Sequence, residues 1–310
     1  MVTVVVLSLL FWFWFGHFCF FNACYRRRSR IYERNDFCGG GEIGEDTKQR
    51  VRECRKWIDG ADFEPIYLTS KDGLRLYAKL ITHREGVLGT VIFVHGYHSS
   101  VRRDLAVQVK TAYDEGYNVL MIFHRSHGPS EGKYICFGAK ERYDVLLWTE
   151  YIAERFEGMP IALFGLSMGA ATVMMSSALE LPENVRCLIA DCGFTSPREI
   201  IANTLRYKHK IMVYPTIFFM NFWGILLAKF NFKEVSTLKT LKKNTRPLLL
   251  IHGDSDAYVP TEMSRKNALV HPELTELYIV EGAKHAQAVY FETDEYLHRQ
   301  VDFLRKNMTK

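Results

Sequence analysis

Three features are missing from this chain of 310 residues, and each absence excludes a class of protein. Only one stretch is long and apolar enough to cross a bilayer, which excludes a polytopic membrane protein. The seven cysteines lack zinc-type spacing, because neither Cys19/Cys24 nor Cys187/Cys192 has a second pair nearby. No residue type dominates: 48% of the chain is hydrophobic and 24% is charged, which excludes a wholly disordered or collagen-like protein.

A strong overall charge is also missing, since the net charge is only +5. Much of this excess comes from one cluster: Arg26, Arg27, Arg28, Arg30 and Arg34. The remainder is nearly neutral, so we expect no nucleic-acid partner. The cysteines are expected to be reduced thiols, most of them buried. His95 and His98 have no third ligand at a metal-binding spacing, so we expect no metal and no organic cofactor.

The chain begins with an apolar segment, residues 2–21, which carries no charge and is rich in Val, Leu, Phe and Trp. Twenty such residues can cross the bilayer core as a helix, so we expect residues 1–24 to be a single transmembrane anchor. Basic residues follow the segment and none precedes it, which places the chain after it on the cytoplasmic side. The alternatives are a cleaved signal, which lacks its positive n-region here, and an apolar N-terminus without a membrane role.

Residues 25–59 are expected to be a linker with one short helix. Cys38-Gly39-Gly40-Gly41 is typical of a flexible connection. Val51, Cys54 and Trp57 then recur at helical spacing among charged residues, which predicts a short amphipathic helix.

From residue 60 to residue 307 the pattern alternates between strand and helix, which predicts an α/β domain with a mostly parallel sheet and helices on both faces. The expected strands are 66–69, 74–81, 90–94, 118–123, 161–164, 188–190, 248–251 and 277–280, and the last helix is expected at 294–306. The first two strands are joined by Asp72-Gly73, a hairpin signal. Ligands of such sheets bind at the carboxyl ends of the strands.

The strand at 161–164 is followed by Gly165-Leu166-Ser167-Met168-Gly169 and then by small residues of a helix. A serine on a sharp strand-to-helix turn is an exposed nucleophile, and its close neighbours on either side must be glycine. We therefore predict Ser167 to be a catalytic nucleophile. The alternative is a loop serine beside structural glycines.

A serine hydroxyl is a weak nucleophile and needs a base that a third group orients. His285 follows the last strand and is the predicted base. Asp191, Asp254 and Asp256 all follow strands and precede His285, so the chain order of nucleophile, acid and base is satisfied by each. We favour Asp256, which precedes the turn at Val259-Pro260, and keep the other two as alternatives.

An oxyanion formed at the substrate carbonyl needs two backbone N–H donors. One is predicted from Met168, at the start of the helix after the nucleophile. The other is predicted from Tyr97 in the loop after the strand at 90–94, where Gly96 gives the backbone its freedom. The side chains of Tyr97 and Met168 are expected to line the substrate pocket.

Five blocks in this order resemble the α/β-hydrolase superfamily, in particular the serine-aminopeptidase (S33) and esterase-like hydrolases of Gram-positive bacteria. The blocks are 95–97, 125–132, 165–169, 191–196 and 253–260 followed by His285. The resemblance covers roughly residues 60–307 and implies an α/β-hydrolase fold with a Ser-His-Asp triad. One departure is His124-Arg125-Ser126, where relatives show an acidic or polar residue, Arg and Gly.

More than fifty residues separate the strands at 188–190 and 248–251, so we expect a short helical cap at about 196–241. Its residues 214–227 are very apolar and are flanked by lysines. Three roles stay open: packing over the sheet, an acyl-binding lid that touches the bilayer, or a second spanning helix. For the lid, the expected substrate-binding side chains are Phe218, Phe219, Phe222 and Trp223.

Together these features predict a membrane-anchored serine hydrolase, carboxylesterase-like or lipase-like, that acts on a small-molecule or lipid ester through an acyl-enzyme. The first alternative is a serine peptidase or aminopeptidase that cleaves amides. The second is a non-catalytic binding protein that keeps the fold.

Overall fold

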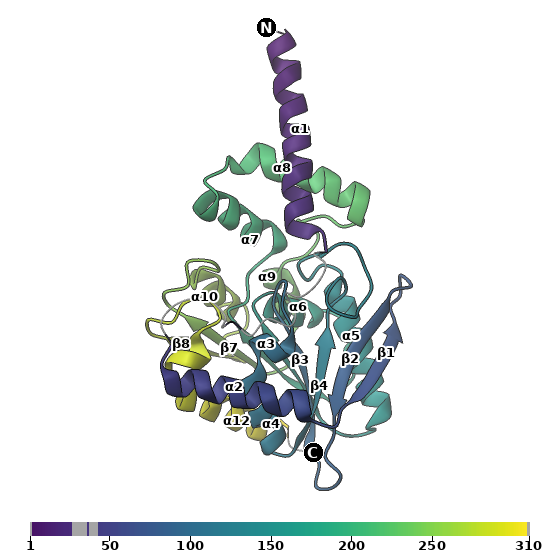
Figure 1. Ribbon diagram of the computed structural model, residues 1–310, viewed down its shortest axis with the longest axis vertical. Helices are drawn as coiled ribbons and strands as arrows, with labels where there is room; N and C mark the ends of the chain where they lie inside the picture. The colour runs from purple at the N-terminus through teal and green to yellow at the C-terminus, as the bar shows by residue number, and fades with distance from the viewer. Residues whose placement is uncertain (1, 27–35, 37–42, 309–310) are drawn as a thin grey trace.

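The computed structural model describes residues 2–26, 36 and 43–308, and their arrangement is drawn in Figure 1. One sheet of eight strands has the order β1-β2-β4-β3-β5-β6-β7-β8. The strands are β1 (Glu64–Thr69), β2 (Arg75–Ile81), β3 (Gly89–Val94), β4 (Tyr117–Phe123), β5 (Ile161–Leu166), β6 (Val185–Asp191), β7 (Leu248–Gly253) and β8 (Thr275–Val280). Only β2 pairs antiparallel, with β1 and β4, and the remaining pairs are parallel. The predicted mostly parallel α/β fold is confirmed.

Helices cover both faces of this sheet, as the alternating pattern predicted. On one face lie α2 (Glu45–Gly60), α3 (Val101–Asp104), α4 (Ala106–Asp114), α11 (Ala288–Phe291) and α12 (Thr293–Asn307). On the other face lie α5 (Glu141–Arg155), α6 (Met168–Ser176) and α10 (Glu262–Ala268). Strand β3 shows why the core has two halves: Val91 and Phe93 point into the first cluster, and Ile92 and Val94 into the second. Every residue of β3 is buried, which explains its apolar composition.

The expected linker region contains a helix that packs on the body. Val51, Cys54 and Ile58 of α2 are buried in the first core cluster together with α4. In Figure 1 this helix runs across the lower part of the molecule. The glycine stretch 39–41 and most of the arginine cluster lie outside the described residues.

The cap rises from the carboxyl end of the sheet. It consists of α7 (Pro197–Asn203), a π-helical turn η2 (Thr204–Lys208), α8 (Val213–Trp223), a second π-helical turn η3 (Gly224–Ala228), α9 (Thr237–Thr240) and the 3₁₀ turn η4 (Leu241–Lys243). Its apolar side chains form a third core cluster that also holds Met168, next to the predicted nucleophile. The cap therefore covers the carboxyl end of the sheet, where Ser167 lies.

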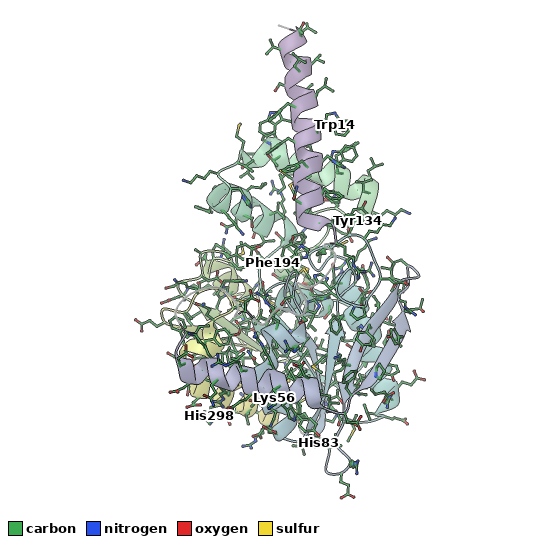
Figure 2. All side chains as sticks on the ribbon, in the orientation of Figure 1. Trp14, Lys56, His83, Tyr134, Phe194 and His298 are labelled. Carbon is green, nitrogen blue, oxygen red and sulfur yellow. The ribbon has the colours of Figure 1, made fainter. Side chains whose placement is uncertain are left out.

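The N-terminal helix α1 (Val2–Cys24) projects from the same end of the molecule (Figure 1). It is the one described helix long and apolar enough to cross a membrane. Its outer part, from Val2 to Phe11, is exposed, whereas Phe20 and Cys24 at its inner end are buried in the third core cluster. Figure 2 shows Trp14 at the height of the cap and Tyr134 and Phe194 below the base of the helix. Helix α1 is thus a candidate membrane span whose inner half packs on the cap.

Candidate active site

The turn between β5 and α6 places Ser167 at the carboxyl end of the sheet. Ser167 has φ 55° and ψ −112°, a backbone conformation that non-glycine residues rarely adopt. The flanking glycines are required by packing: a Cβ on Gly165 would lie 2.3 Å from the Gly169 carbonyl oxygen, and one on Gly169 would lie 2.0 Å from the Val94 carbonyl oxygen. Ser167 is therefore held in a strained backbone conformation, at a turn where the backbone of α6 packs directly against the backbones of β5 and β3.

Ser167, His285 and Asp256 form one chain of hydrogen bonds. The Ser167 Oγ lies 2.9 Å from His285 Nε2, and His285 Nδ1 lies 2.6 Å from Asp256 Oδ2. An ionised carboxylate only accepts hydrogen bonds, so Nδ1 carries the proton and Nε2 faces the hydroxyl as a base. This is the geometry in which an imidazole can take the proton of a serine hydroxyl.

Asp256 is held in its charged form. Its side chain has no exposed surface, and its other oxygen accepts hydrogen bonds from the N–H groups of Tyr258 (2.9 Å) and Val259 (2.8 Å). Burial opposes ionisation, but hydrogen bonds with His252 and His285 outweigh it and hold the pKa of Asp256 well below its ordinary value. A permanent negative charge beside Nδ1 stabilises the imidazolium that His285 becomes on protonation.

The two alternative acids lie elsewhere. Asp254 is exposed, and its Oδ1 accepts the Gly282 N–H at 2.8 Å, which braces the loop that carries the histidine. Asp191 is buried and accepts the hydroxyl of Tyr296 at 2.8 Å, and burial raises its pKa to about 6. Neither carboxylate has a hydrogen bond with His285 among those of the described residues, so the geometry favours Asp256.

The loop after β3 lies against the nucleophile, as an oxyanion loop must. A Cβ on Gly96 would lie 3.5 Å from Ser167 Cβ, which places the Gly96-Tyr97 backbone beside the hydroxyl. Met168 begins α6, so its N–H lies at a helix N-terminus. The Tyr97 side chain lines a cavity above the site, whereas Met168 is fully buried in the third core cluster and does not line that cavity.

Asp104 is a positioning residue that sequence reasoning missed. Its Oδ2 accepts the Gly96 N–H at 2.8 Å, and its other oxygen accepts the Ser99 hydroxyl. The residue is buried at the end of the four-residue helix α3. No motif marks it, since the sequence signal is one aspartate eight positions after a glycine. It fixes the loop from which the second oxyanion donor is expected.

Three buried histidines support the same loop. His127 Nε2 accepts the His98 N–H at 3.1 Å, and His95 Nε2 accepts the His124 N–H at 3.1 Å. Each acceptor nitrogen must be unprotonated, so these rings are neutral. Beside them Arg125 forms paired hydrogen bonds of 2.7 Å with the buried Asp144. The departure from the family pattern at 124–126 is therefore structural support and holds no part of the triad.

A cavity of about 430 Å³ lies between the cap and α1, next to these groups. Tyr97 and Tyr258 line it, and the Tyr258 ring lies 5.0 Å from the His285 ring. Ser167 and His285 themselves do not line it, and Tyr258 is the lining residue that contacts the His285 ring. Its volume falls in the range of small-molecule sites.

None of the four aromatic residues expected in an acyl-binding lid lines this cavity. Phe219 packs against Gly16 of α1, and Trp223 packs on Phe13 at 4.8 Å between ring centres. Phe218 and Phe222 are exposed on the outer side of α8. The sequence could not show that α1 covers the inner side of α8, which leaves Met220 as the residue of that helix that lines the cavity.

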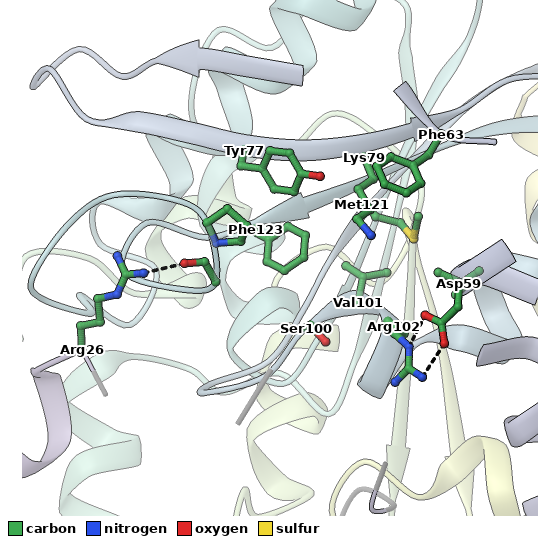
Figure 3. A pocket seen from close by; sticks show the side chains of 13 residues that line it. Arg26, Asp59, Phe63, Tyr77, Lys79, Ser100, Val101, Arg102, Met121 and Phe123 are labelled. Atoms are coloured by element: carbon green, nitrogen blue, oxygen red, sulfur yellow. Dashed lines mark hydrogen bonds and ion pairs between the residues drawn. The ribbon is translucent and has the colours of Figure 1, made fainter. Parts of the chain in front are cut away.

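A second hollow, of about 970 Å³, lies away from the triad (Figure 3). Side chains of β2 and β4 form one wall, and α3 forms the other, where Arg102 pairs with Asp59 at 2.5 Å (Figure 3). It contains no triad residue, so it is not the place where Ser167 would act.

One group of described side chains could hold a metal ion by distance alone: Cys192, Asp256 and His285. Asp256 and His285 are already joined by the 2.6 Å hydrogen bond, and burial raises the pKa of the Cys192 thiol. A neutral thiol and an engaged carboxylate make a poor metal site.

Comparison with known proteins finds a family model that matches part of the chain. Residues 86–217 match the family described as serine aminopeptidase, S33. The protein YqkD of Bacillus subtilis strain 168 is 29% identical over 217 residues, which is 69% of this chain and 70% of that protein. The protein YfhR of Escherichia coli K12 is 25% identical over 250 residues, 78% of this chain and 80% of its own.

Solved structures share the architecture. The Pyrococcus furiosus esterase Pf2001 superposes with a TM-score of 0.64 at 23% identity and covers 88% of this chain and 97% of its own. A Mycobacterium tuberculosis puromycin-hydrolyzing peptidase superposes with a TM-score of 0.61 at 16% identity, over 80% of this chain and 40% of its own. At such identities the likeness shows the fold, on which esterases and peptidases both occur.

Proposed function

We propose that the chain is a member of the α/β-hydrolase superfamily and a membrane-anchored serine hydrolase that cleaves a carboxylic ester through an acyl-enzyme, a proposal that the family match over residues 86–217 and the shared fold support. The observation that carries this proposal is the chain of hydrogen bonds from Ser167 through His285 to Asp256, at 2.9 and 2.6 Å. Nothing in that chain needs a cofactor, because proton transfer and nucleophilic attack both come from side chains.

The proposed reaction has two halves. Ser167 Oγ attacks the ester carbonyl carbon while His285 Nε2 takes its proton, and the oxyanion is held by the N–H groups of Tyr97 and Met168. The tetrahedral intermediate collapses as His285 gives that proton to the leaving alcohol, which leaves an acyl group on Ser167. Water, activated by the same histidine, then releases the acid and restores the serine.

An ester is favoured over the amino terminus of a peptide by the cavity beside the triad. An aminopeptidase needs a carboxylate to hold the substrate ammonium group. None of the described residues that line the cavity is Asp or Glu, and its exposed edge carries Lys208 and His209 instead. The amide alternative retains support from the matched family description and from the peptidase neighbour, so both substrate classes belong in the assay.

Membrane anchoring through α1 is part of the proposal. Its 23 residues extend about 35 Å, enough for a bilayer core of about 30 Å. The arginines that follow favour a cytoplasmic catalytic domain. A Leu269→Cys variant, whose site is exposed on the body, should react with an impermeant maleimide in inverted vesicles and be protected in intact cells. Labelling in intact cells instead would reverse the orientation.

The direct test is hydrolysis of p-nitrophenyl esters from acetate to palmitate by the detergent-solubilised full chain. Ser167→Ala should lower turnover at least about a thousandfold, because the nucleophile is removed while the fold is kept. Aminoacyl p-nitroanilides assayed in parallel test the amide alternative. Near-normal ester turnover by Ser167→Ala would reject the nucleophile, and serine-dependent cleavage of anilides alone would reject the ester.

A further inference from the structure

The outer side of the cap is largely apolar, and the charged side chains that border it, Arg198 and Lys233, come from outside α8 and η3. From Val213 to Ala228, which covers α8 and η3, the sequence has no charged residue. We call five of the six exposed side chains of this stretch the outer cap face: Tyr214, Phe218, Phe222, Ile225 and Leu226. The sixth, Leu227, lines a separate hollow beside Lys229. A contiguous exposed apolar surface of this kind marks a site of interaction with another apolar phase.

Three polar side chains of the same helix have hydrogen-bond partners within the protein. The Thr216 hydroxyl donates to the Met212 carbonyl oxygen at 2.6 Å, and the Asn221 Oδ1 accepts the Phe232 N–H at 2.9 Å. The Trp223 indole N–H donates to the Phe13 carbonyl oxygen at 3.1 Å. A segment that enters hydrocarbon must satisfy its polar groups internally, and α8 meets that condition at these three side chains.

Helix α8 lies beside the middle of the candidate membrane span. Its contacts on α1 include Phe13, Gly16 and His17, whose ring centre lies 4.6 Å from that of Trp223, and a Cβ on Gly16 would lie 2.3 Å from Phe219 Cβ. Phe13 is eight residues from Phe21, the end of the apolar segment, or about 12 Å along the helix. If α1 crosses a core of about 30 Å, this contact lies within the leaflet next to the catalytic domain. Helix α8 must then lie in that leaflet too.

Basic residues border the apolar stretch where a headgroup layer would be. Lys210 precedes α8 and Lys229 follows η3, and both are exposed. Residues 197–243 carry nine Lys and Arg against two Glu, so the cap holds more positive charge than the whole chain shows net. An apolar helix bordered by lysines is the pattern of a segment embedded at an anionic membrane surface.

The cavity above the triad runs along α1 toward this leaflet. Its lining on α1 extends from Ala23 to Phe18, about 7.5 Å along the helix axis. At its inner end the Tyr97 hydroxyl donates to the Ala23 carbonyl oxygen at 2.6 Å, which ties the expected oxyanion loop to the helix. The anchor is thus one wall of the cavity.

The lining suits a hydrocarbon chain. Leu205, Ile211 and Met220 contribute apolar surface from the cap. The polar side chains of Asn22 and Thr204 donate to carbonyl oxygens of their own helices, at 2.8 and 2.9 Å, so these donors do not demand a polar ligand.

From these observations we infer that α8 and η3 are embedded in the leaflet beside α1, and that the cavity between them takes the acyl chain of a membrane lipid ester directly from that leaflet. The inference rests on the proposed ester hydrolysis and names its substrate class. It gives α1 a second role, because a helix that anchors the protein also forms the wall of the acyl site.

The leaflet placement is tested without any activity. Phe218 and Leu269 are 67% and 77% exposed in the protein itself, so Phe218→Cys and Leu269→Cys are a matched pair. In inverted membrane vesicles an impermeant maleimide should label Leu269→Cys at least tenfold faster than Phe218→Cys. Equal rates would overturn the placement. A disulfide-linked dimer of Phe218→Cys on mild oxidation would overturn it as well, since a second copy would then cover the face.

The acyl site is tested by chain length. Cys19 lines the cavity on α1, and Ser8 lies on the exposed outer part of the same helix, so Cys19→Trp and Ser8→Trp add similar bulk at the two places. In proteoliposomes Cys19→Trp should lower kcat/KM for palmitate esters at least tenfold more than kcat/KM for butyrate esters. Ser8→Trp should leave both within twofold.

The outcomes separate the two proposals. Serine-dependent hydrolysis with an unchanged chain-length profile in Cys19→Trp would overturn the acyl site and keep the hydrolase. Absence of serine-dependent hydrolysis at every chain length would overturn the hydrolase and the acyl occupant together, and the maleimide rates would still decide the leaflet placement.

Discussion

Asp256 is the residue on which the proposed site depends most. Four groups point at its carboxylate: His285, His252 and the N–H groups of Tyr258 and Val259. They hold it ionised and fix its direction, so Oδ2 faces Nδ1 of His285 in a single arrangement. Asp254, two residues earlier, instead accepts the Gly282 N–H and orients the loop that precedes the histidine. The two aspartates therefore have different chemical duties.

This division predicts opposite outcomes for two conservative changes. Asp256→Asn should lower kcat on a p-nitrophenyl ester about a thousandfold or more, because an amide N–H facing His285 favours the wrong tautomer. Asp254→Asn should cost less than about tenfold, since its amide oxygen can still accept the Gly282 N–H. Thermal denaturation of both variants controls for folding. The reverse ranking of kcat would assign the acid to Asp254.

Sequence reasoning at this scale found three aspartates that follow strands, and it favoured Asp256 without excluding the other two. Asp191, Asp254 and Asp256 satisfy the same chain order, and only the path of the loop to His285 separates them. The role of Asp104 could not be predicted, because it depends on how a four-residue helix folds back onto Gly96. The sequence also could not show which side of α8 the lid aromatics take, because the partner of α8 on α1 is about 200 residues away in the chain.

At the scale of elements, the catalytic turn depends on how closely α6 approaches β3. A Cβ on Gly169 would lie 2.0 Å from the Val94 carbonyl oxygen and 2.7 Å from that of His95. Neither backbone can move freely, because β3 is buried and paired on both sides by β4 and β5. The helix can start where it does only while residue 169 has no side chain.

Gly169→Ala should therefore destabilise the protein by about 3 kcal/mol or more, through a backbone clash that no rotamer can relieve. Gly60→Ala is the matched control: Gly60 ends α2, and a Cβ there would meet nothing within 4 Å. That control should change stability by less than about 1 kcal/mol. Chemical denaturation in detergent measures both. Equal stability of the two variants would contradict the close packing of α6 on β3.

The elements themselves were predictable where burial sets the pattern. Strand β3 is apolar throughout because both its faces are covered, and the hairpin turn at Asp72-Gly73 joins β1 and β2 with Gly73 at φ 85°. The short helices α3, α10 and α11 were not predicted, since four to seven residues show too little periodicity. The apolar stretch of α8 left three roles open. In a helix that is hydrophobic on all sides, the sequence pattern does not indicate which side packs against the protein.

For the molecule as a whole, α1 and the catalytic body share one core. Phe20 and Cys24 of the helix are buried in the same cluster as Met168 and Phe194. The anchor was predicted from the length and apolarity of the first segment, but the anchor and the domain were predicted to be separate units joined by a linker. Two distant segments share a core only if tertiary contacts join them, such as the contact between Gly16 and Phe219. Such a contact cannot be predicted from the local sequence pattern of either segment.

The balance of buried titratable groups sets the acid stability of this body. Burial, against weaker opposing contacts, lowers the pKa of His95, His124 and His127. These histidines stay neutral in the folded state and take up protons only on unfolding, so acidification below their unfolded pKa of about 6.5 favours unfolding. Burial raises the pKa of Asp144 and of Asp191 to about 6, and these two carboxyls act in the opposite sense below that pH. Because there are three such histidines and two such carboxyls, we expect the effect of the histidines to be the larger one.

The melting temperature should therefore fall steadily as the pH is lowered from 7 to 5, and each neutral buried histidine contributes up to about 1.4 kcal/mol per pH unit below 6.5. His127→Asn should flatten this dependence even if it lowers stability at pH 7, because one proton fewer is taken up on unfolding. His298 is exposed on α12, so His298→Asn should leave the slope unchanged. Scanning calorimetry in detergent at several pH values measures the slope. A melting temperature that stays constant or rises toward pH 5 would mean that the histidines under the Gly96-Tyr97 loop are protonated in the folded protein. The structure excludes that state for the two rings that accept the His98 and His124 N–H groups, because a protonated ring nitrogen cannot accept a hydrogen bond.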